Sequence, residues 1–411
     1  MTRSWFNPRT LLDPAVLADI YRHEDPAANA WLFPETVIEH GESLDASVAI
    51  PDELVDLYRQ LGRPTPLLRA TRLEEHLGTR SAIYLKREDV LPNGSFKISS
   101  ALAQAWFGKR EGRTVVVTET AAGQTGVAAA LASSLVGLSC EILMVRSSFD
   151  RKQLRRLLMA SYGADVRPSP SEDTEAGRRF IAAGHQDGSI AIATSEVFEL
   201  LDGRSGGMNI AGSLLDFTLL YSSVIGLEVT EQLRQLDVVP EVAVGCVGGG
   251  SSFGGFALPM LDAHPDLRLV ATESTAIPTL TKGRYDFDHP DGEGQAPPLK
   301  MFSLGHDFSA PKMHASGLRY HAASPIVSAL VHQGRIEAEA HDETEAMEAA
   351  LLLARLQGLV VSPESSYSLL SAFRRATDPE LPPANIVVLV SGSGHLDLDA
   401  YASLLTPPAA P

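Results

Sequence analysis

A lysine closes the segment GSFK, residues 94–97, at a point where the sequence pattern changes from strand to helix. An amine that forms an imine must be neutral part of the time, and burial beside a bound cofactor lowers the pKa of a lysine enough for that. Lys97 is therefore a candidate for covalent attachment through an imine. The alternative is a solvated lysine at the start of a helix, which carries no chemistry.

A glycine-rich segment, GGGSS at residues 248–252, follows the strand-like run VAVGCV and precedes the helical run FGGFALPML. Backbone N–H groups at a helix N-terminus bind anions, and glycines let several of them converge on one phosphate. The predicted phosphate cradle consists of Gly248, Gly249, Gly250, Ser251 and Ser252. The Lys-Ser/Thr ending of a nucleotide-triphosphate loop is missing. A simple tight turn is the alternative interpretation.

A second loop of this kind, ETAAGQTG at residues 119–126, lies between a predicted strand and a predicted helix. The N–H groups of residues 121–125 are expected to form a nest that suits a substrate carboxylate. Glu119 stands at the C-terminal end of its strand, where ligands bind in open α/β sheets. It could act there as a general acid or base, or it could be only an N-cap or a solvated loop residue.

The segment SGSG at residues 391–394 follows the last strand-like run, IVVLV. Ser391 could hydrogen-bond the nitrogen of a bound pyridine ring, and the alternative is a polar turn. Each of these polar segments thus lies beside the end of a predicted strand. The sheets that contain these strands must therefore position the side chains.

Strands and helices alternate from about residue 83. Strand-like runs occupy residues 83–89, 113–120, 140–146 and 164–169, and helical runs occupy residues 96–110, 126–137 and 151–163. A second series has helices at residues 214–236 and 343–358 and strands at residues 242–250, 267–273 and 386–394. Apolar β-branched runs separated by helical periodicity predict parallel sheets covered on both faces. Gly358 is the expected C-cap of the helix before it.

Three segments lack such periodicity. Residues 1–50 are rich in Pro, Asp and His and are predicted to be an irregular arm that wraps the folded body. Residues 277–313 are rich in Gly, Pro and His and are predicted to be a loop long enough to have a function. Residues 405–411, LTPPAAP, are predicted to be a disordered tail.

The composition limits the functions that are open to the chain. Its 411 residues are 44% hydrophobic and 21% charged, as expected for one large or two closely packed globular domains. The formal net charge of −17 disfavours binding to nucleic acid or to anionic membrane surfaces. Cys140 and Cys246 lie in apolar runs without metal-ligand spacing, so we expect buried inert thiols and no metal site. Since neither a signal peptide nor a membrane-length apolar run is evident, we expect a cytoplasmic enzyme.

The segments KREDVLPNGSFK, ETAAGQTG, CVGGGSS, PESSYSL and VSGSG, in this order and spacing, resemble those of tryptophan synthase β-subunits. The resemblance covers nearly the whole chain and is closest to the second, longer subgroup, which LTKGRYDF, LKMFSLGHDF and HASGLRYHAASP also resemble. It implies the α/β type II fold of pyridoxal-phosphate (PLP) enzymes, with two open, twisted, mostly parallel sheets covered by helices and an N-terminal arm. It also implies a smaller mobile domain of residues 1–62 and 96–220, a cofactor-binding domain of residues 63–95 and 221–411, and a site at their interface.

The resemblance further implies roles for individual residues. Lys97 would hold PLP as a Schiff base, and Glu119 would be the catalytic acid or base. Residues 248–252 would bind the phosphate, Ser391 would bind the pyridine nitrogen, and Glu364 would lie near the cofactor ring. The residues implied in substrate binding are Thr120, Ala121, Ala122, Gly123, Gln124, Thr125 and Arg319.

The chain departs from the family pattern mainly on the acceptor side. Phe96 replaces a His and residues 98–100, Ile-Ser-Ser, replace Asn or Pro-Asn, a string that resembles threonine synthases and dehydratases instead. Thr125 replaces the His or Trp at the floor of the nucleophile pocket, and Ser252 replaces an Asn. Arg319 stands where the commoner subgroup has an aspartate that handles the serine hydroxyl, and it is similar to the longer subgroup. We therefore expect an acceptor pocket that differs from that of an indole-specific synthase.

The residues favour chemistry at the β-carbon of an amino acid, because a serine at the pyridine nitrogen makes the ring a weaker electron sink and favours expulsion of a β-substituent. We expect β-replacement on serine or an O-activated serine through an aminoacrylate, with indole or a different small nucleophile as acceptor. One alternative is a serine or threonine dehydratase (deaminase). Another is a non-catalytic PLP-binding partner subunit, against which the presence of both Lys97 and Glu119 argues. The resemblance also implies a homodimer that needs no α-subunit, and a monovalent cation is a further candidate cofactor.

Overall fold

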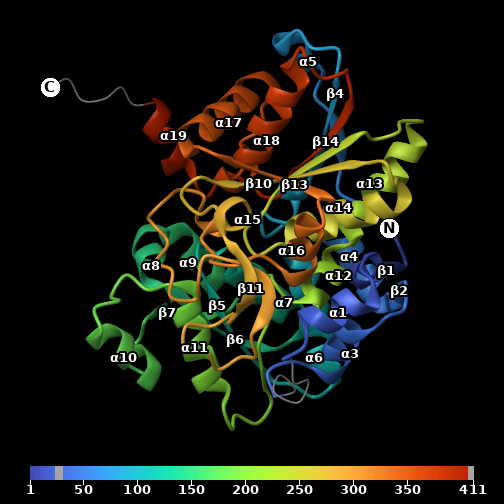
Figure 1. Ribbon diagram of the computed structural model, residues 1–411. Coiled ribbons are helices and arrows are strands. Elements are labelled where there is room, and N and C mark those ends of the chain that lie inside the picture. Colours follow the sequence, from blue (N-terminus) through green and yellow to red (C-terminus); the bar gives the residue numbers. More distant parts are fainter. Residues whose placement is uncertain (24–30, 406–411) are drawn as a thin grey trace, which may run out of the picture.

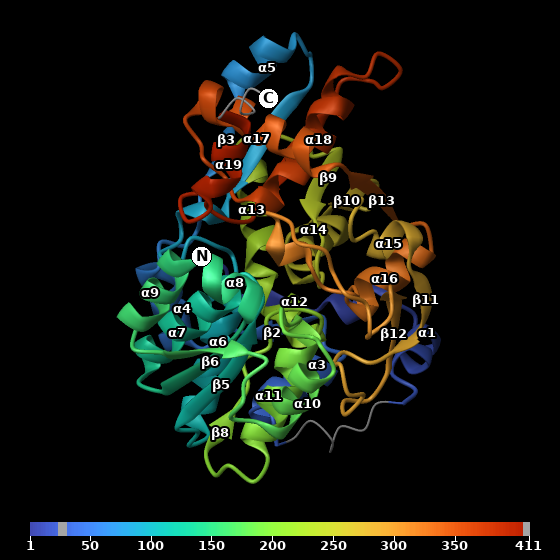
Figure 2. The same cartoon turned by 90° about the vertical axis from the view of Figure 1, so that its left-hand side faces the viewer.

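The computed structural model describes residues 1–23 and 31–405, and the strands of this part of the chain form a six-stranded sheet, a four-stranded sheet and two antiparallel pairs. The six-stranded sheet has the order β13 (Ile336–His341), β10 (Arg268–Ser274), β9 (Val242–Cys246), β14 (Asn385–Val390), β4 (Ala82–Arg87) and β3 (Leu67–Arg69). Its neighbouring strands are parallel except for the pair β3 and β4. This sheet occupies the upper half of Figures 1 and 2.

The four-stranded sheet lies in the lower half of both views and is parallel throughout. Its order is β7 (Asp165–Ser169), β6 (Ser139–Val145), β5 (Val115–Thr120) and β8 (Gly207–Met208). The two sheets confirm the predicted α/β fold with mostly parallel strands. The strands β3 and β4 join the larger sheet although they precede β5 to β8 in the chain. The division into two domains with boundaries near residues 62, 95 and 220 stays a proposal.

Helices pack against both sheets. On the smaller sheet, α7 (Gln124–Val136) and α11 (Ile190–Leu201) contact β5 and β6, and on the larger sheet α14 (Ser251–Ala263) and α18 (Pro363–Thr377) contact β9. The helix α7 can approach β5 and β6 closely because Ala128, Ala129 and Ala130, which are fully buried, have small side chains. The helix α17 (Glu343–Gln357) ends as predicted at Gly358, which is left-handed with φ +70°. The remaining α-helices are α1 (Pro14–Ile20), α3 (Glu35–Glu42), α4 (Asp52–Gln60), α5 (Thr71–Leu77), α6 (Ile98–Arg110), α8 (Arg146–Arg151), α9 (Gln153–Ser161), α10 (Glu175–Ala182), α12 (Asp216–Ser222), α13 (Val224–Gln235), α15 (Thr279–Lys282), α16 (Pro325–His332) and α19 (Leu398–Leu405).

The N-terminal arm is more regular than the predicted irregular segment. It contains α1, α3, the short 3-10 helix η1 (Pro8–Leu11), and the antiparallel strands β1 (Ser4–Phe6) and β2 (Ser47–Ala49). The sequence pattern misses these elements because each spans only a few residues. The arm packs on the body as expected, since the buried Trp5 ring lies 4.8 Å from the ring of Tyr221 on α12.

The prediction of an unbroken loop at residues 277–313 is wrong. The segment contains α15 and an antiparallel hairpin of β11 (Arg284–Asp288) and β12 (Leu299–Ser303). Although RYDFD of β11 alternates polar and aromatic residues, the Gly- and Pro-rich stretch between the two strands hides the hairpin in the sequence. The predicted helix at 214–236 is also divided, because α12 ends at Ser222 and α13 begins at Val224. Of the predicted tail, residues 406–411 lie outside the described residues. None of the helices in residues 1–23 and 31–405 has the length and hydropathy of a membrane span.

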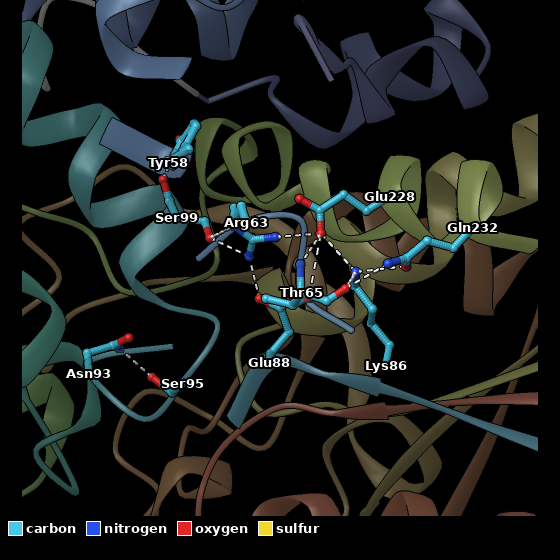
Figure 3. A network of polar contacts seen from close by, with 10 residues as sticks. All are labelled: Tyr58, Arg63, Thr65, Lys86, Glu88, Asn93, Ser95, Ser99, Glu228 and Gln232. Carbon is cyan, nitrogen blue, oxygen red and sulfur yellow. Dashed lines mark hydrogen bonds and ion pairs between the residues drawn. The ribbon is translucent and has the colours of Figure 1, made fainter. Parts of the chain in front are cut away.

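A network of buried charges joins the start of α6 to the larger sheet (Figure 3). Arg63 donates through Nε to Ser99 Oγ at 3.0 Å and forms ion pairs with Glu88 and with Glu228 on α13. Lys86 of β4 donates to Glu228 Oε2 at 2.8 Å. All five side chains are buried. Two cations and two carboxylates therefore balance one another, and the network holds the first turn of α6 against β4 and α13.

Replacement of Lys86 by methionine tests this network. Lys86→Met keeps an apolar stem but leaves Glu228 buried with one cation fewer. Breaking a buried ion pair costs about 3–5 kcal/mol, so the free energy of unfolding in urea should fall by about that amount. The control is Glu231→Gln on α13, the helix that carries Glu228. The Glu231 carboxylate pairs with Arg234 in solvent, so this substitution should leave the urea midpoint unchanged. Equal effects of the two substitutions would show that the buried network contributes no more stability than an exposed ion pair.

Candidate active site

Lys97 lies directly before α6, and its side chain reaches the wall of a cavity of about 150 Å³. Its Nζ donates to the carbonyl oxygen of Gly212 at 3.1 Å. Burial lowers the pKa of Lys97 from 10.5 to about 8, and the nearby Glu364 carboxylate opposes this shift only in part. The preceding residue, Phe96, donates its N–H to the carbonyl oxygen of Ser391 at 3.0 Å. The structure thus places Lys97 in a cavity and not, as in the alternative interpretation, in bulk solvent.

The segment GGGSS forms the start of α14, whose first residue is Ser251. Gly250 is left-handed with φ +105°, and a Cβ there would lie 2.9 Å from the Cβ of Ser324, so this position requires glycine. The first N–H groups of an α-helix have no partner within the helix. No side chain in the described part of the chain caps α14. The buried N-terminus of this helix can therefore bind an anion. Gly249 lies on the cavity wall, and the other residues of GGGSS do not.

The segment ETAAGQTG bends between β5 and α7 as predicted. The hydroxyl oxygen of Thr120 accepts hydrogen bonds from the N–H groups of Gly123 at 3.1 Å and Gly126 at 3.2 Å. The Thr120 side chain therefore shapes the loop from within. Residues of this segment that lie on the cavity wall are Glu119, Thr120, Ala121, Ala122, Gln124 and Thr125.

Glu119 is held by an amide that sequence reasoning missed. Asn209 donates through Nδ2 to Glu119 Oε2 at 3.1 Å and to the carbonyl oxygen of Val117 at 3.0 Å. Burial raises the pKa of Glu119, and the hydrogen bond from Asn209 opposes this shift. Asn209 follows the two-residue strand β8 and carries no periodic signal. It reaches Glu119 because β8 pairs with β5.

Ser391 and Glu364 lie beside the cavity but not on its wall. Ser391 is buried, and its hydroxyl oxygen is 3.1 Å from that of Ser365 and 3.7 Å from the sulfur of Cys246. Glu364, in the first turn of α18, accepts the N–H of Gly317 at 2.8 Å and the side-chain amide of Gln124 at 3.1 Å. Glu364 thus links the first turn of α7 to the segment around Gly317.

Most of the cavity wall away from Lys97 and Glu119 is apolar. Three distant segments supply it: the N-terminal arm, α11, and the turn between β11 and β12 with the first residue of β12. Their apolar lining residues are Leu32, Phe33, Ile190, Phe198, Pro290, Ala296, Pro297 and Leu299. The turn is held by Asp291, a fully buried carboxylate that accepts the backbone N–H groups of Glu293, Gln295 and Ala296. We call the part of the wall with Lys97 and Glu119 the polar end and the part formed by these three segments, which also includes Thr194, the apolar end.

Arg319 also lines the cavity. Its Nη2 donates to the carbonyl oxygen of Ala310 at 2.8 Å, and its Nε has no partner among the residues that the structure describes. Burial and the positive charge of Arg151 lower the pKa of Arg319. Arg319 thus brings a cation to the cavity wall, and its predicted role in substrate binding stays a prediction.

Comparisons with known proteins agree with this geometry. A family described as "Pyridoxal-phosphate dependent enzyme" matches residues 58–392. The chain is 44% identical to the tryptophan synthase beta chain of Pyrobaculum islandicum, over 98% of this chain and 97% of that one. It is 40% identical to the tryptophan synthase beta chain 2 of Pyrococcus furiosus, over 98% of this chain and 93% of that one. The solved structure of a threonine deaminase from T.th. has a TM-score of 0.61 at 21% identity over 84% of this chain and 97% of that one, which shows a shared fold.

The residues present fit the cofactor that this family carries. Lys97 is a half-buried amine whose pKa, lowered to about 8, permits imine formation, and the uncapped N-terminus of α14 suits a phosphate. Lys97 lies between β4 and α6 and Gly249 lies between β9 and α14, and both residues line the same cavity. The chain therefore belongs to the family of pyridoxal-phosphate-dependent enzymes and is a homologue of tryptophan synthase β chains.

Proposed function

We propose that the chain catalyses β-replacement on serine or an O-activated serine, with a small apolar nucleophile as the acceptor. The observation that carries this proposal is the division of one cavity into two ends. Lys97, Glu119 and the loop of residues 120–125 share the polar end, and aromatic and aliphatic side chains form the other. An amino acid fits the polar end, and a second, apolar substrate fits the space beside it.

Several residues would hold PLP. Lys97 would bind it covalently, the N–H groups of residues 248–252 would bind its phosphate, and Ser391 would face its ring nitrogen, with Glu364 near the ring. When bound, PLP supplies an imine linkage and an electron-withdrawing ring, which together permit loss of a proton from Cα and of a substituent from Cβ. Ser391 is a neutral partner for a ring nitrogen, which favours loss of the β-substituent over prolonged charge on the ring.

The chain itself would move the protons. Lys97 Nζ, with a pKa of about 8, is suited to accept the proton from Cα of the amino-acid donor. The Glu119 carboxyl, whose pKa burial raises, is suited to protonate the leaving oxygen on Cβ and then to accept a proton from the nucleophile. Asn209 would orient Glu119 for both transfers, since it donates to one of its oxygens. The turn held by Asp291 would keep water out of the apolar end.

The apolar end favours an apolar nucleophile, which is indole or a different compound. Thr125 lies on the cavity wall in the first turn of α7, where a smaller side chain leaves more room than the family's His or Trp.

A serine or threonine dehydratase remains the second candidate, because of the string FKISS. Water as the acceptor gains nothing from Leu32, Phe33 and Phe198, so this candidate is weaker. The homodimer, the independence from an α-subunit, the monovalent cation and the cytoplasmic location stay predictions.

Uptake of PLP by the apoprotein should depend on pH with an apparent pKa of about 8. Lys97 can form an imine only as the neutral amine, so the uptake rate should fall about tenfold per pH unit below this pKa and level off above it. Absorbance of the protein-bound cofactor measures the rate. Lys97→Ala should retain no PLP after borohydride reduction, as judged by mass spectrometry. A label on another lysine in the wild-type protein would contradict the assignment.

Glu119→Gln should stop proton transfer while keeping the hydrogen bond from Asn209. General acids and bases contribute about 100- to 10,000-fold, so kcat for β-replacement should fall by that factor. Binding of PLP and of L-serine, followed by absorbance, should stay close to that of the wild type. A loss of kcat smaller than about tenfold would reassign Glu119 to a structural role.

Thr125→His tests whether this position governs the acceptor. In a panel of nucleophiles with L-serine, we expect the wild type to have its highest kcat/KM with a nucleophile other than indole. Misfits of methylene size in apolar pockets are worth about 1–3 kcal/mol, so indole should still react, more slowly. Thr125→His should shift preference toward indole, and the matched control Thr125→Ser, which keeps the hydroxyl, should not. A wild type that prefers indole over the whole panel would overturn this interpretation, and release of ammonia and keto acid alone would favour the dehydratase.

A further inference from the structure

A buried arginine contacts the loop that is proposed to bind the donor carboxylate. Arg155 lies on α9 and is 2% exposed. Its Nη1 donates to the carbonyl oxygen of Ala122 at 2.7 Å, and its Nη2 pairs with one carboxylate oxygen of Asp397. Lys152 pairs with the other oxygen of Asp397. An arginine, a lysine and one carboxylate thus form a buried cluster beside the loop that follows β5.

This contact fixes the peptide group between Ala122 and Gly123. The carbonyl oxygen accepts from Arg155, and the N–H donates to Thr120 Oγ1 at 3.1 Å. Gly123 has φ +94°, and a Cβ there would lie 3.0 Å from Arg155 Cδ, so the arginine stem packs against the bare glycine. Both polar groups of this peptide are therefore bound within the protein. The N–H groups of Gln124 and Thr125, at the start of α7, have no partner within the helix and remain for a ligand.

We propose that Arg155 is a positioning residue for the carboxylate of the amino-acid donor. By holding the Ala122 peptide, it keeps the loop in the conformation in which the start of α7 can bind a carboxylate. This inference rests on the proposed function, because it requires a donor whose carboxylate binds residues 121–125.

Asp397 orients the guanidinium in turn and connects the loop to the segment that follows β14, which carries Ser391. Arg155 meets two partners with two different nitrogens, Ala122 through Nη1 and Asp397 through Nη2. The planar fork of an arginine can do this in one fixed geometry, and the single ammonium of a lysine cannot. The arrangement therefore predicts that Arg155 cannot be replaced by lysine without loss.

The test compares two ligands of the PLP-loaded enzyme, L-serine and L-serine amide, which differ in the carboxylate. Binding is followed by the change in absorbance of the bound cofactor. Arg155→Met should weaken binding of L-serine about 10- to 100-fold, the range for lost hydrogen bonds to a charged group. Binding of the amide should change far less, so the preference for serine over its amide should fall. If Arg155 had a role in folding alone, the substitution would weaken the binding of both ligands equally.

Two further variants separate geometry from charge. Arg155→Lys keeps the charge and loses the fork, so we expect it to lower the serine preference almost as much as Arg155→Met. The matched control is Lys152→Met, which removes the other cation that pairs with Asp397. Lys152 does not hold the Ala122 peptide, so the preference of this variant for serine over its amide should stay near that of the wild type. If Arg155→Met does not fold, Arg155→Lys and Asp397→Asn carry the test, and both should lower the preference.

The outcomes are distinct. If the Arg155 variants prefer L-serine over L-serine amide as strongly as the wild type does, the positioning role is overturned and the proposed function stays intact. Equal weakening of both ligands would also overturn it. A wild-type enzyme whose absorbance does not respond to L-serine would remove the proposed function, and this inference with it.

Discussion

A lysine is neutral for part of the time near physiological pH when burial disfavours its charged form, and Lys97 meets this condition in its cavity. Burial lowers its pKa to about 8, and the pull of Glu364 in the other direction is too weak to reverse this. Burial also raises the pKa of Glu119 on the same cavity wall. One physical cause thus brings a base and an acid toward neutral pH from opposite directions. The rest of the site depends on keeping this cavity dry and its walls in place.

Two buried charge networks hold the loops around the cavity. Arg63 fixes the first turn of α6, next to Lys97, and Arg155 contacts the loop that follows β5. Buried charges are costly unless each has a partner, and a buried ion pair often adds little net stability. In both networks every cation has a carboxylate partner among the described residues. Their main contribution is therefore geometry, because a paired charge in the interior has few alternative positions.

The two ends of the cavity are built differently. The polar end lies at strand ends and helix starts, where β5 leads to α7 and β9 leads to α14. The apolar end is built by the N-terminal arm, α11 and the turn between β11 and β12. Segments outside the sheets can change without disturbing the strands, so a fold of this kind can keep its cofactor chemistry while its acceptor changes. Thr125, in the first turn of α7, lines the same cavity.

Local patterns in the sequence predicted the strands β4, β5, β6, β7, β9, β10 and β14 and the helices α6, α7, α9, α14 and α17, because hydrophobic periodicity depends on neighbouring residues. They also located the loops at residues 94–97, 119–126 and 248–252, since glycine and polar residues directly after a strand are typical of turns and helix starts. Only the tertiary structure decided which side chains meet. Asn209 reaches Glu119 across 90 positions of the chain, and Asp397 reaches Arg155 across 242. Contacts over such separations leave no periodic pattern, because they arise from the pairing of strands and the packing of helices and not from the order of neighbouring residues.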